Sequence, residues 1–212
     1  ANHYLKKKFA VIGISRTKQK LKKKNYFHYA FDISKKPELI KNMKKIFIEH
    51  KNIDYLINNV ATNNSFGIFS FISEKSILTD IQTNILANLY LTKIVSNHMI
   101  RQKFGRIVNI GSVSTKLLLK GDAIYASCKS FVDTFTKILS KELVWHGVTC
   151  NVISISLFDG RLNKKISSKT LSMIRKKYKR EKFVNIQEIT NILDKKIFIK
   201  SIKNNSKIYN IF

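Results

Sequence analysis

The chain has 212 residues, 44% of them hydrophobic, which is enough to bury the core of one folded domain. This composition excludes an intrinsically disordered chain, and no apolar run reaches the length of a membrane-spanning helix. The 40 lysine and arginine residues outnumber the 13 aspartate and glutamate residues, so the net charge is +27. Cys128 and Cys150 lack the spacing of metal ligands, so we expect no metal site and a reducing, cytoplasmic compartment.

Short apolar segments alternate with amphipathic segments along the chain. Strands are predicted over residues 9–14, 26–31, 53–57, 106–110, 149–155 and 207–212. Helices are predicted at 1–8, which resembles the end of a helix, from Pro37 to Phe47, from Ser76 or Thr79 to Gln102, and over 122–146, 167–180 and 186–199. Residues 17–25 are predicted to form a helical turn and a loop, and residues 62–77 a loop that has room for one helical turn.

This alternation predicts an α/β fold, a Rossmann-like, doubly wound parallel sheet with helices on both faces, formed by residues 1–212 as a single domain. Ligands of such sheets bind beyond the carboxyl ends of the strands. Four candidate polar residues follow predicted strands, namely Arg16, Asp32, Asn59 and Ser112. We therefore expect a binding site at this edge of the sheet.

The positive charge has two interpretations, a surface that binds nucleic acid or an anionic membrane, and compositional drift. The chain is rich in residues with AT-rich codons and holds only 7 glycines and 1 proline. Its lysines are spread along the whole chain rather than gathered in one block. These observations favour drift, so we expect neither nucleic acid nor membrane as a partner, although the charge would steer anionic ligands to the protein.

The stretch from Gly105 to Lys129 carries the clearest chemical pattern. An apolar strand is followed by a Gly-Ser turn ending at Ser112 and by a helix start with Tyr125 and Lys129 one turn apart. The same Tyr-x-x-x-Lys spacing recurs at Tyr4 and at Tyr178, but only Tyr125 follows such a strand and turn. Taken singly, Ser112 is an ordinary turn serine.

Several motifs together resemble one known family. They are Asn58-Asn59-Val60-Ala61, Asn84 in a long helix, Ser112 in IGS, and the YASCK sequence with Tyr125 and Lys129. On these residues the chain resembles the short-chain dehydrogenase/reductase family over almost its whole length. The segment that begins GRIVNIGSV is most similar to bacterial 3-oxoacyl-acyl-carrier-protein reductases.

The resemblance implies four catalytic residues. Tyr125 would protonate the carbonyl oxygen as general acid, or act as base in reverse, and Lys129 would lower its pKa and bind the nicotinamide ribose. Ser112 would hold the substrate carbonyl, and Asn84 would hold a water that relays protons to Lys129. The nicotinamide would supply the hydride.

The resemblance also implies a cofactor site. The second strand of the fold ends at Ser15 and Arg16 where enzymes specific for NAD carry an acid, which favours NADP(H) over NAD(H). The alternative for Arg16 is a solvated surface cation. The remaining cofactor contacts would come from Asp32 and Ile33 at the adenine, from Asn59, Val60 and Ala61 at the adenosine ribose, and from Tyr125, Lys129 and Phe158.

The chain departs from the family pattern in two places. It has no TGxxxGxG loop, and it begins inside what resembles the family's first helix, so we expect a fragment clipped at both ends. The missing strand would lie in the middle of the sheet, between 9–14 and 53–57, and its loss would weaken stability and cofactor binding. Ile155-Ser156 replaces the family's Pro-Gly, Gly160 its threonine and Ala61 its glycine, which indicates a relaxed pocket or decaying activity.

The sequence therefore predicts an NADP(H)-dependent carbonyl reductase, with a 3-oxoacyl thioester on acyl carrier protein in fatty acid synthesis as the suggested substrate. One alternative is a non-catalytic relative that acts as a binding or assembly partner, and another is a basic nucleic-acid-binding protein. The resemblance implies a homodimer or homotetramer that packs through helices 79–102 and 122–146. The segment after Phe158 would form the substrate lid.

Overall fold

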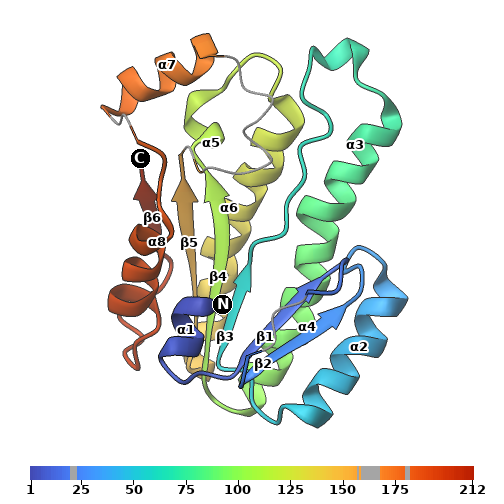
Figure 1. Ribbon diagram of the computed structural model, residues 1–212, viewed down its shortest axis with the longest axis vertical. Coiled ribbons are helices and arrows are strands. Elements are labelled where there is room, and N and C mark those ends of the chain that lie inside the picture. The colour runs from blue at the N-terminus through green and yellow to red at the C-terminus, as the bar shows by residue number, and fades with distance from the viewer. Residues whose placement is uncertain (20–22, 157, 159–167, 180–181) are drawn as a thin grey trace.

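The computed structural model describes residues 1–19, 23–156, 158, 168–179 and 182–212. Strands and helices alternate through these residues (Figure 1). The strands are β1 (Val11–Ser15), β2 (Tyr26–Ala30), β3 (Tyr55–Asn58), β4 (Gly105–Ser112), β5 (Val148–Ile155) and β6 (Ile208–Ile211). The helices are α1 (Asn2–Lys6), α2 (Lys36–Glu49), α3 (Glu74–Ile81), α4 (Asn88–Arg101), α5 (Ser114–Leu117), α6 (Ala123–Leu143), α7 (Ser168–Tyr178) and α8 (Ile186–Ile192).

The strands form two parallel sheets rather than one. β1 pairs with β2, and β3, β4, β5 and β6 pair in that order, all in parallel. The predicted α/β fold with a parallel sheet covered by helices is confirmed. The interruption lies between β1 and β3, the place where the sequence analysis expects a missing strand.

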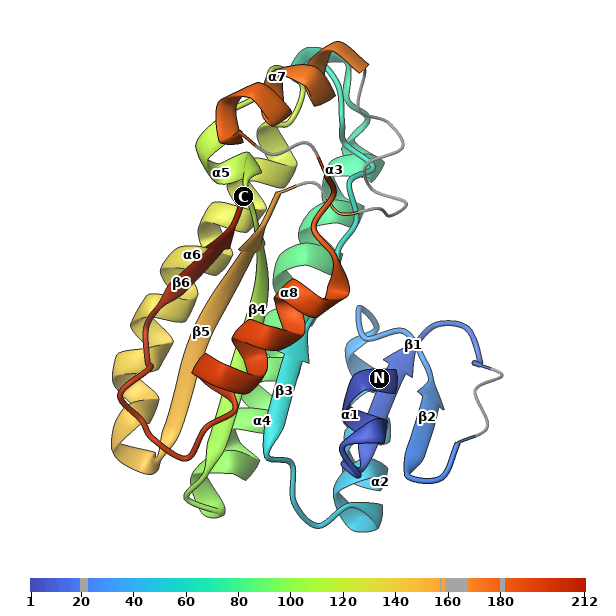
Figure 2. The ribbon, with the colours of Figure 1, turned by 60° about the vertical axis from the view of Figure 1, so that its left-hand side comes forward.

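The helices cover both faces of the sheets because each buries one apolar stripe. On one face, α2 has Pro37, a residue suited to a first helical turn, as its second residue, and it buries Met43 and Ile46 in the same core as Met99 of α4. On the other face, α1 lies beside the residues that follow α8 (Figure 2), where the ring of Tyr4 contacts that of Phe198. α1 therefore packs on the same face of the sheets as α8.

The centre of the larger sheet is fully buried. The first five residues of β4 and the first seven of β5 are buried, as expected for parallel strands covered on both faces. Arg106 in β4 is also buried, and its guanidinium donates to the carbonyls of Gly147 at 2.9 Å, Ile199 at 2.9 Å and Lys200 at 2.7 Å. Burial lowers the pKa of Arg106, and these carbonyls replace the water that its charge has lost.

The structure corrects two local predictions. The helix predicted from Ser76 or Thr79 is α3, which Ser73 caps, followed by a π-helix over Gln82–Ala87 and then α4. The 62–77 segment holds one helical turn, a 3-10 turn at Phe69–Phe71, and α5 forms between Ser112 and the helix predicted over 122–146, where no helix is predicted. Gly160 and the lid expected over 159–167 lie outside the described residues. In the described part of the chain, no helix combines the length and hydrophobicity needed to cross a bilayer.

Candidate active site

The candidate catalytic residues meet at the carboxyl edge of the larger sheet. β4 ends at Ser112, the short helix α5 follows, and α6 begins at Ala123, so that Tyr125 and Lys129 lie in its first two turns. Ser112 is buried, its hydroxyl donates to Ser114 Oγ at 3.2 Å, and it lies near enough to Tyr125 to lower the pKa of that residue. The Ser112 Oγ also accepts the N–H of Ser114 at 3.2 Å, so the turn holds this hydroxyl in place.

The pKa of Tyr125 is raised to about 12, chiefly because the hydroxyl is removed from water. The Ser112 hydroxyl acts in the opposite direction, while the charges of Asp122, Cys128 and Asp80 raise the pKa further. The prediction that Lys129 lowers the pKa of Tyr125 is therefore wrong in this structure. Tyr125 holds its proton firmly at neutral pH.

The reason lies in where the Lys129 side chain ends. Its Nζ donates to the carbonyl of Ile110 at 2.7 Å and lies 5.6 Å from the centre of the Tyr125 ring. Lys129 is only 6% exposed, and this burial lowers its pKa to about 8, although Cys128 and Asp133 act to raise it. Lys129 therefore keeps most of its positive charge at pH 7 and loses it as the pH rises above 8.

Asn84 lies in the π-helix that joins α3 to α4, a form of helix found often at functional sites. Its side chain makes two hydrogen bonds to the backbone of Thr62: it accepts the N–H at 2.8 Å and donates to the carbonyl at 2.8 Å. It also lies near Cys128, the residue before Lys129, and acts to lower the pKa of that thiol. The carbonyl of Asn84 accepts Nδ2 of Asn88 at 3.0 Å.

The structure thus brings Ser112, Tyr125, Lys129 and Asn84 into one connected group. Sequence analysis missed Thr62, Asp80 and Asn88, which hold this group. Asn88 follows Asn84 by one helical turn, and this repeated amide is the only sequence signal we find for the three.

The residues predicted to hold the adenosine end lie at the ends of β1 and β2. The Ser15 hydroxyl donates to the carbonyl of Thr17 at 2.8 Å and lies 3.2 Å from Nε2 of His28, while Arg16 is exposed. Burial raises the pKa of Asp32, but hydrogen bonds from Ser34 and the charge of Arg16 outweigh it and hold the pKa low. A hydroxyl and an exposed guanidinium fit a phosphate group at this position.

The other predicted cofactor contacts have different environments. Asn59 and Val60 are exposed just after β3, and Ala61 is half-buried. Ile33 is buried in the core that contains α2, and Phe158 forms a parallel bridge with Val184. The exposed strand ends fit the adenosine part of a dinucleotide, while the buried Ser112 and Lys129 and the half-buried Tyr125 fit its nicotinamide end.

Comparison with known proteins identifies the class. Residues 1–171 match the model of the short chain dehydrogenase family, so the chain belongs to this family and the resemblance is confirmed. The 3-oxoacyl-acyl-carrier-protein reductase FabG of Buchnera aphidicola subsp. Schizaphis graminum is 31% identical over 199 residues, covering 91% of this chain and 80% of that protein. The reductase of the same name from Buchnera aphidicola subsp. Acyrthosiphon pisum is 30% identical over 176 residues, which cover 79% of this chain and 71% of that protein.

Solved structures give the same fold. The closed form of serine dehydrogenase complexed with NADP+ has a TM-score of 0.83 at 22% identity and covers 99% of this chain and 87% of that chain. An NAD+-bound xylitol dehydrogenase has a TM-score of 0.78 at 19% identity, covering 88% and 78%. At these identities the likeness establishes the Rossmann-like fold of an oxidoreductase family that binds nicotinamide cofactors.

Proposed function

We propose that the protein is an NADP(H)-dependent reductase of a carbonyl substrate. The observation that carries the proposal is that Ser112, Tyr125 and the buried cation Lys129 lie together, with Lys129 Nζ 5.6 Å from the centre of the Tyr125 ring and Ser112 near enough to act on the pKa of Tyr125. A bound carbonyl oxygen could accept hydrogen bonds from both hydroxyls, which would orient the carbonyl and polarise it. Because the pKa of Tyr125 is raised to about 12, this residue is protonated at neutral pH and holds the proton that a general acid must give to the carbonyl oxygen.

The chain's own residues divide the remaining work. NADPH supplies the hydride when it is bound. Tyr125 donates its proton to the carbonyl oxygen, and Ser112 holds that oxygen in place. Lys129 binds the nicotinamide ribose, and Asn84 connects Lys129 to a proton source through a water. Ser15 and Arg16 bind the 2′-phosphate of the adenosine.

The charge of Lys129 gives the reaction a pH dependence. The folded-state pKa of Lys129 is lowered to about 8, so its ammonium form is lost as the pH rises through that value. We expect kcat/KM for reduction to fall above about pH 8, because this parameter reports groups of the free enzyme. A pH profile measured with NADPH and a 3-oxoacyl thioester tests this, and a profile that is level from pH 7 to pH 10 contradicts it.

Cofactor choice depends on Arg16. Titrations with NADPH and with NADH, followed by cofactor fluorescence, should give micromolar binding with NADPH preferred. Arg16→Glu should weaken NADPH binding by about tenfold or more, since it replaces a charge-assisted hydrogen bond by repulsion, and leave NADH binding nearly unchanged. Lys18→Glu, an equal charge change at an exposed neighbour, is the control. The role of Arg16 is contradicted if Arg16→Glu weakens the binding of NADPH and NADH equally, or if Arg16→Glu and Lys18→Glu weaken NADPH binding equally.

The substrate we propose is a 3-oxoacyl thioester carried by acyl carrier protein in fatty acid synthesis. The relatives at 31% and 30% identity bear this activity in their names. Acyl carrier proteins are generally acidic, and a net charge of +27 suits such a partner. We also propose a cytoplasmic homodimer or homotetramer, supported by exposed apolar side chains along α6 and its 3-10 extension, which are Phe131, Ile138 and Trp145.

A non-catalytic binding role is the second candidate, and one observation favours it. Where the family has Pro-Gly, the strand β5 continues through Ile155, which is paired with Ser112 of β4 and with Ile211 of β6. A proline cannot donate in such a ladder. This candidate predicts an intact fold, no turnover, and no effect of replacing Ser112 or Tyr125 on partner binding.

A further inference from the structure

Asp80 is a buried carboxylate with an unusual set of partners. It is 0% exposed, and no salt bridge between described residues includes it. Its oxygens accept hydrogen bonds from Thr62 Oγ1 at 2.7 Å, from the N–H of Asn64 at 2.9 Å and of Ser65 at 2.9 Å, and from the side chains of Asn64 and Ser65. Every donor belongs to residues 62–65.

These donors keep the carboxylate ionised. Burial by itself raises the pKa of Asp80, but the hydroxyls of Ser65 and Thr62 and the N–H groups of Asn64 and Ser65 lower it below its usual value. A buried charge without a cation is costly unless hydrogen bonds replace its water. Asp80 and residues 62–65 therefore stabilise each other, and the carboxylate fixes the backbone of this segment.

The same segment touches the candidate catalytic group from two sides. Thr62 is the residue whose backbone N–H and carbonyl hold the Asn84 side chain. Asn63 donates from Nδ2 to Asp122 at 3.2 Å, and Asp122 is the N-cap of α6, the helix that carries Tyr125. Residues 62–65 thus connect the π-helix to the start of α6.

We propose that Asp80 is a positioning residue that holds residues 62–65 between Asn84 and Asp122 and so fixes the proton relay relative to Tyr125. This inference rests on the proposed reductase function for its effect on rate. Asp80 itself is assigned no contact with substrate or cofactor.

The chain offers a local reporter that does not need turnover. Cys128 lies one residue from Lys129, is buried, and is near enough to the Asn84 side chain for that amide to lower its pKa. Cys150 is the other cysteine, fully buried in β5, and burial raises its pKa to about 12. Reaction of Cys150 with a thiol reagent therefore reports global unfolding, whereas reaction of Cys128 alone reports release of Asn84 and its surroundings.

The main variant is Asp80→Asn, which keeps the shape but presents an amide NH2 to N–H donors. We expect a thiol reagent, with sites identified by mass spectrometry, to modify Cys128 at least tenfold faster and Cys150 at an unchanged rate. We expect kcat for reduction to fall about 100-fold, as for an active-site displacement of 1 Å. Glu74→Gln removes an exposed acid from the same helix and should change neither rate.

Thr62→Val is a milder variant, because it removes one donor and keeps the backbone that holds Asn84. It should move Cys128 reactivity and kcat in the same direction by a few fold, and it serves if Asp80→Asn does not fold. The proposal is overturned if Asp80→Asn speeds the modification of Cys128 and Cys150 equally, or if it leaves the modification rate of Cys128 unchanged. An unchanged kcat overturns it too. If the wild-type chain shows no turnover, the proposed function fails, and the labelling still decides whether Asp80 holds this segment.

Discussion

Tyr125→Phe should abolish the oxidation of NADPH by a carbonyl substrate. The Tyr125 hydroxyl is the only group in our mechanism that gives a proton to the substrate oxygen, and a phenyl ring cannot replace it. General acid catalysis contributes about 10²- to 10⁴-fold, so we expect kcat to fall at least 100-fold. The affinity for NADPH, measured by fluorescence titration, should change little, because most of the proposed cofactor contacts lie at the strand ends. The loss of NADPH absorbance with a 3-oxoacyl thioester measures the rate.

Tyr178→Phe is the matched control. Tyr178 precedes Lys182 with the same spacing, but it lies at the end of α7, where its ring contacts Phe212. Its loss should leave the rate near that of the wild type. If Tyr125→Phe retains the wild-type rate, the reductase mechanism is wrong and the non-catalytic alternative is preferred.

The sequence contains the fold and the catalytic motifs because both are local patterns. Buried parallel strands are short and apolar, so their positions could be predicted to within about two residues, as could most helices. Ser112, Tyr125 and Lys129 could be found because one strand, one turn and one helix start place them together. The sequence could also predict a break between β1 and β3, since the spacing of the predicted strands leaves room for one more strand there.

What could not be predicted depends on burial and on long-range contacts. In the sequence, Asp80 has the helical spacing of a solvent-facing acid, and only the folded chain shows its oxygens surrounded by residues 62–65. The pKa of Tyr125 was predicted to fall because Lys129 is near in sequence. The folded chain turns the lysine Nζ to the Ile110 carbonyl and buries both groups, which reverses the direction.

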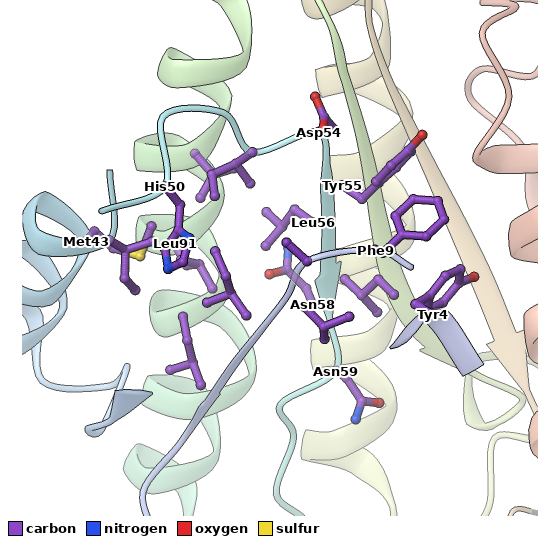
Figure 3. Close-up of a pocket in the computed structure, with 18 of the residues that line it drawn as sticks. Tyr4, Phe9, Met43, His50, Asp54, Tyr55, Leu56, Asn58, Asn59 and Leu91 are labelled. Atoms are coloured by element: carbon purple, nitrogen blue, oxygen red, sulfur yellow. The ribbon is translucent and has the colours of Figure 1, made fainter. Parts of the chain in front are cut away.

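The space between the two sheets is expected to lower the stability of the fold. A pocket of about 350 Å³ lies between β1 and β3 (Figure 3). Apolar side chains close it on both sides, with Met43 and Leu91 on one and Tyr4, Phe9 and Phe198 on the other. Among the described residues, β1 pairs only with β2 and β3 only with β4, so two strand edges face this pocket without partners. Buried backbone groups without partners destabilise a fold.

We expect the 212-residue chain to unfold below about 50 °C, and an extension that fills this pocket to raise Tm by at least about 10 °C. The extension places a designed five-residue apolar strand, a glycine-containing turn and a helical segment before Ala1. α1 runs opposite to β1 (Figure 2), so a strand that leads into it would run parallel to β1 and β3 and could pair with both. Each new hydrogen bond adds about 1 kcal/mol net, and each kcal/mol raises Tm by about 2–4 °C.

The control is an extension of the same length with serine and glycine at the strand positions, which cannot fill an apolar pocket. Circular dichroism melts of the three proteins give the comparison. NADPH titrations should show tighter binding with the apolar strand, because completing the sheet fixes Ser15 at the end of β1 relative to Asn59 after β3. If both extended proteins have the same Tm as the original chain, the open edges do not limit its stability. The same conclusion follows if the original chain melts cooperatively above about 50 °C and binds NADPH tightly.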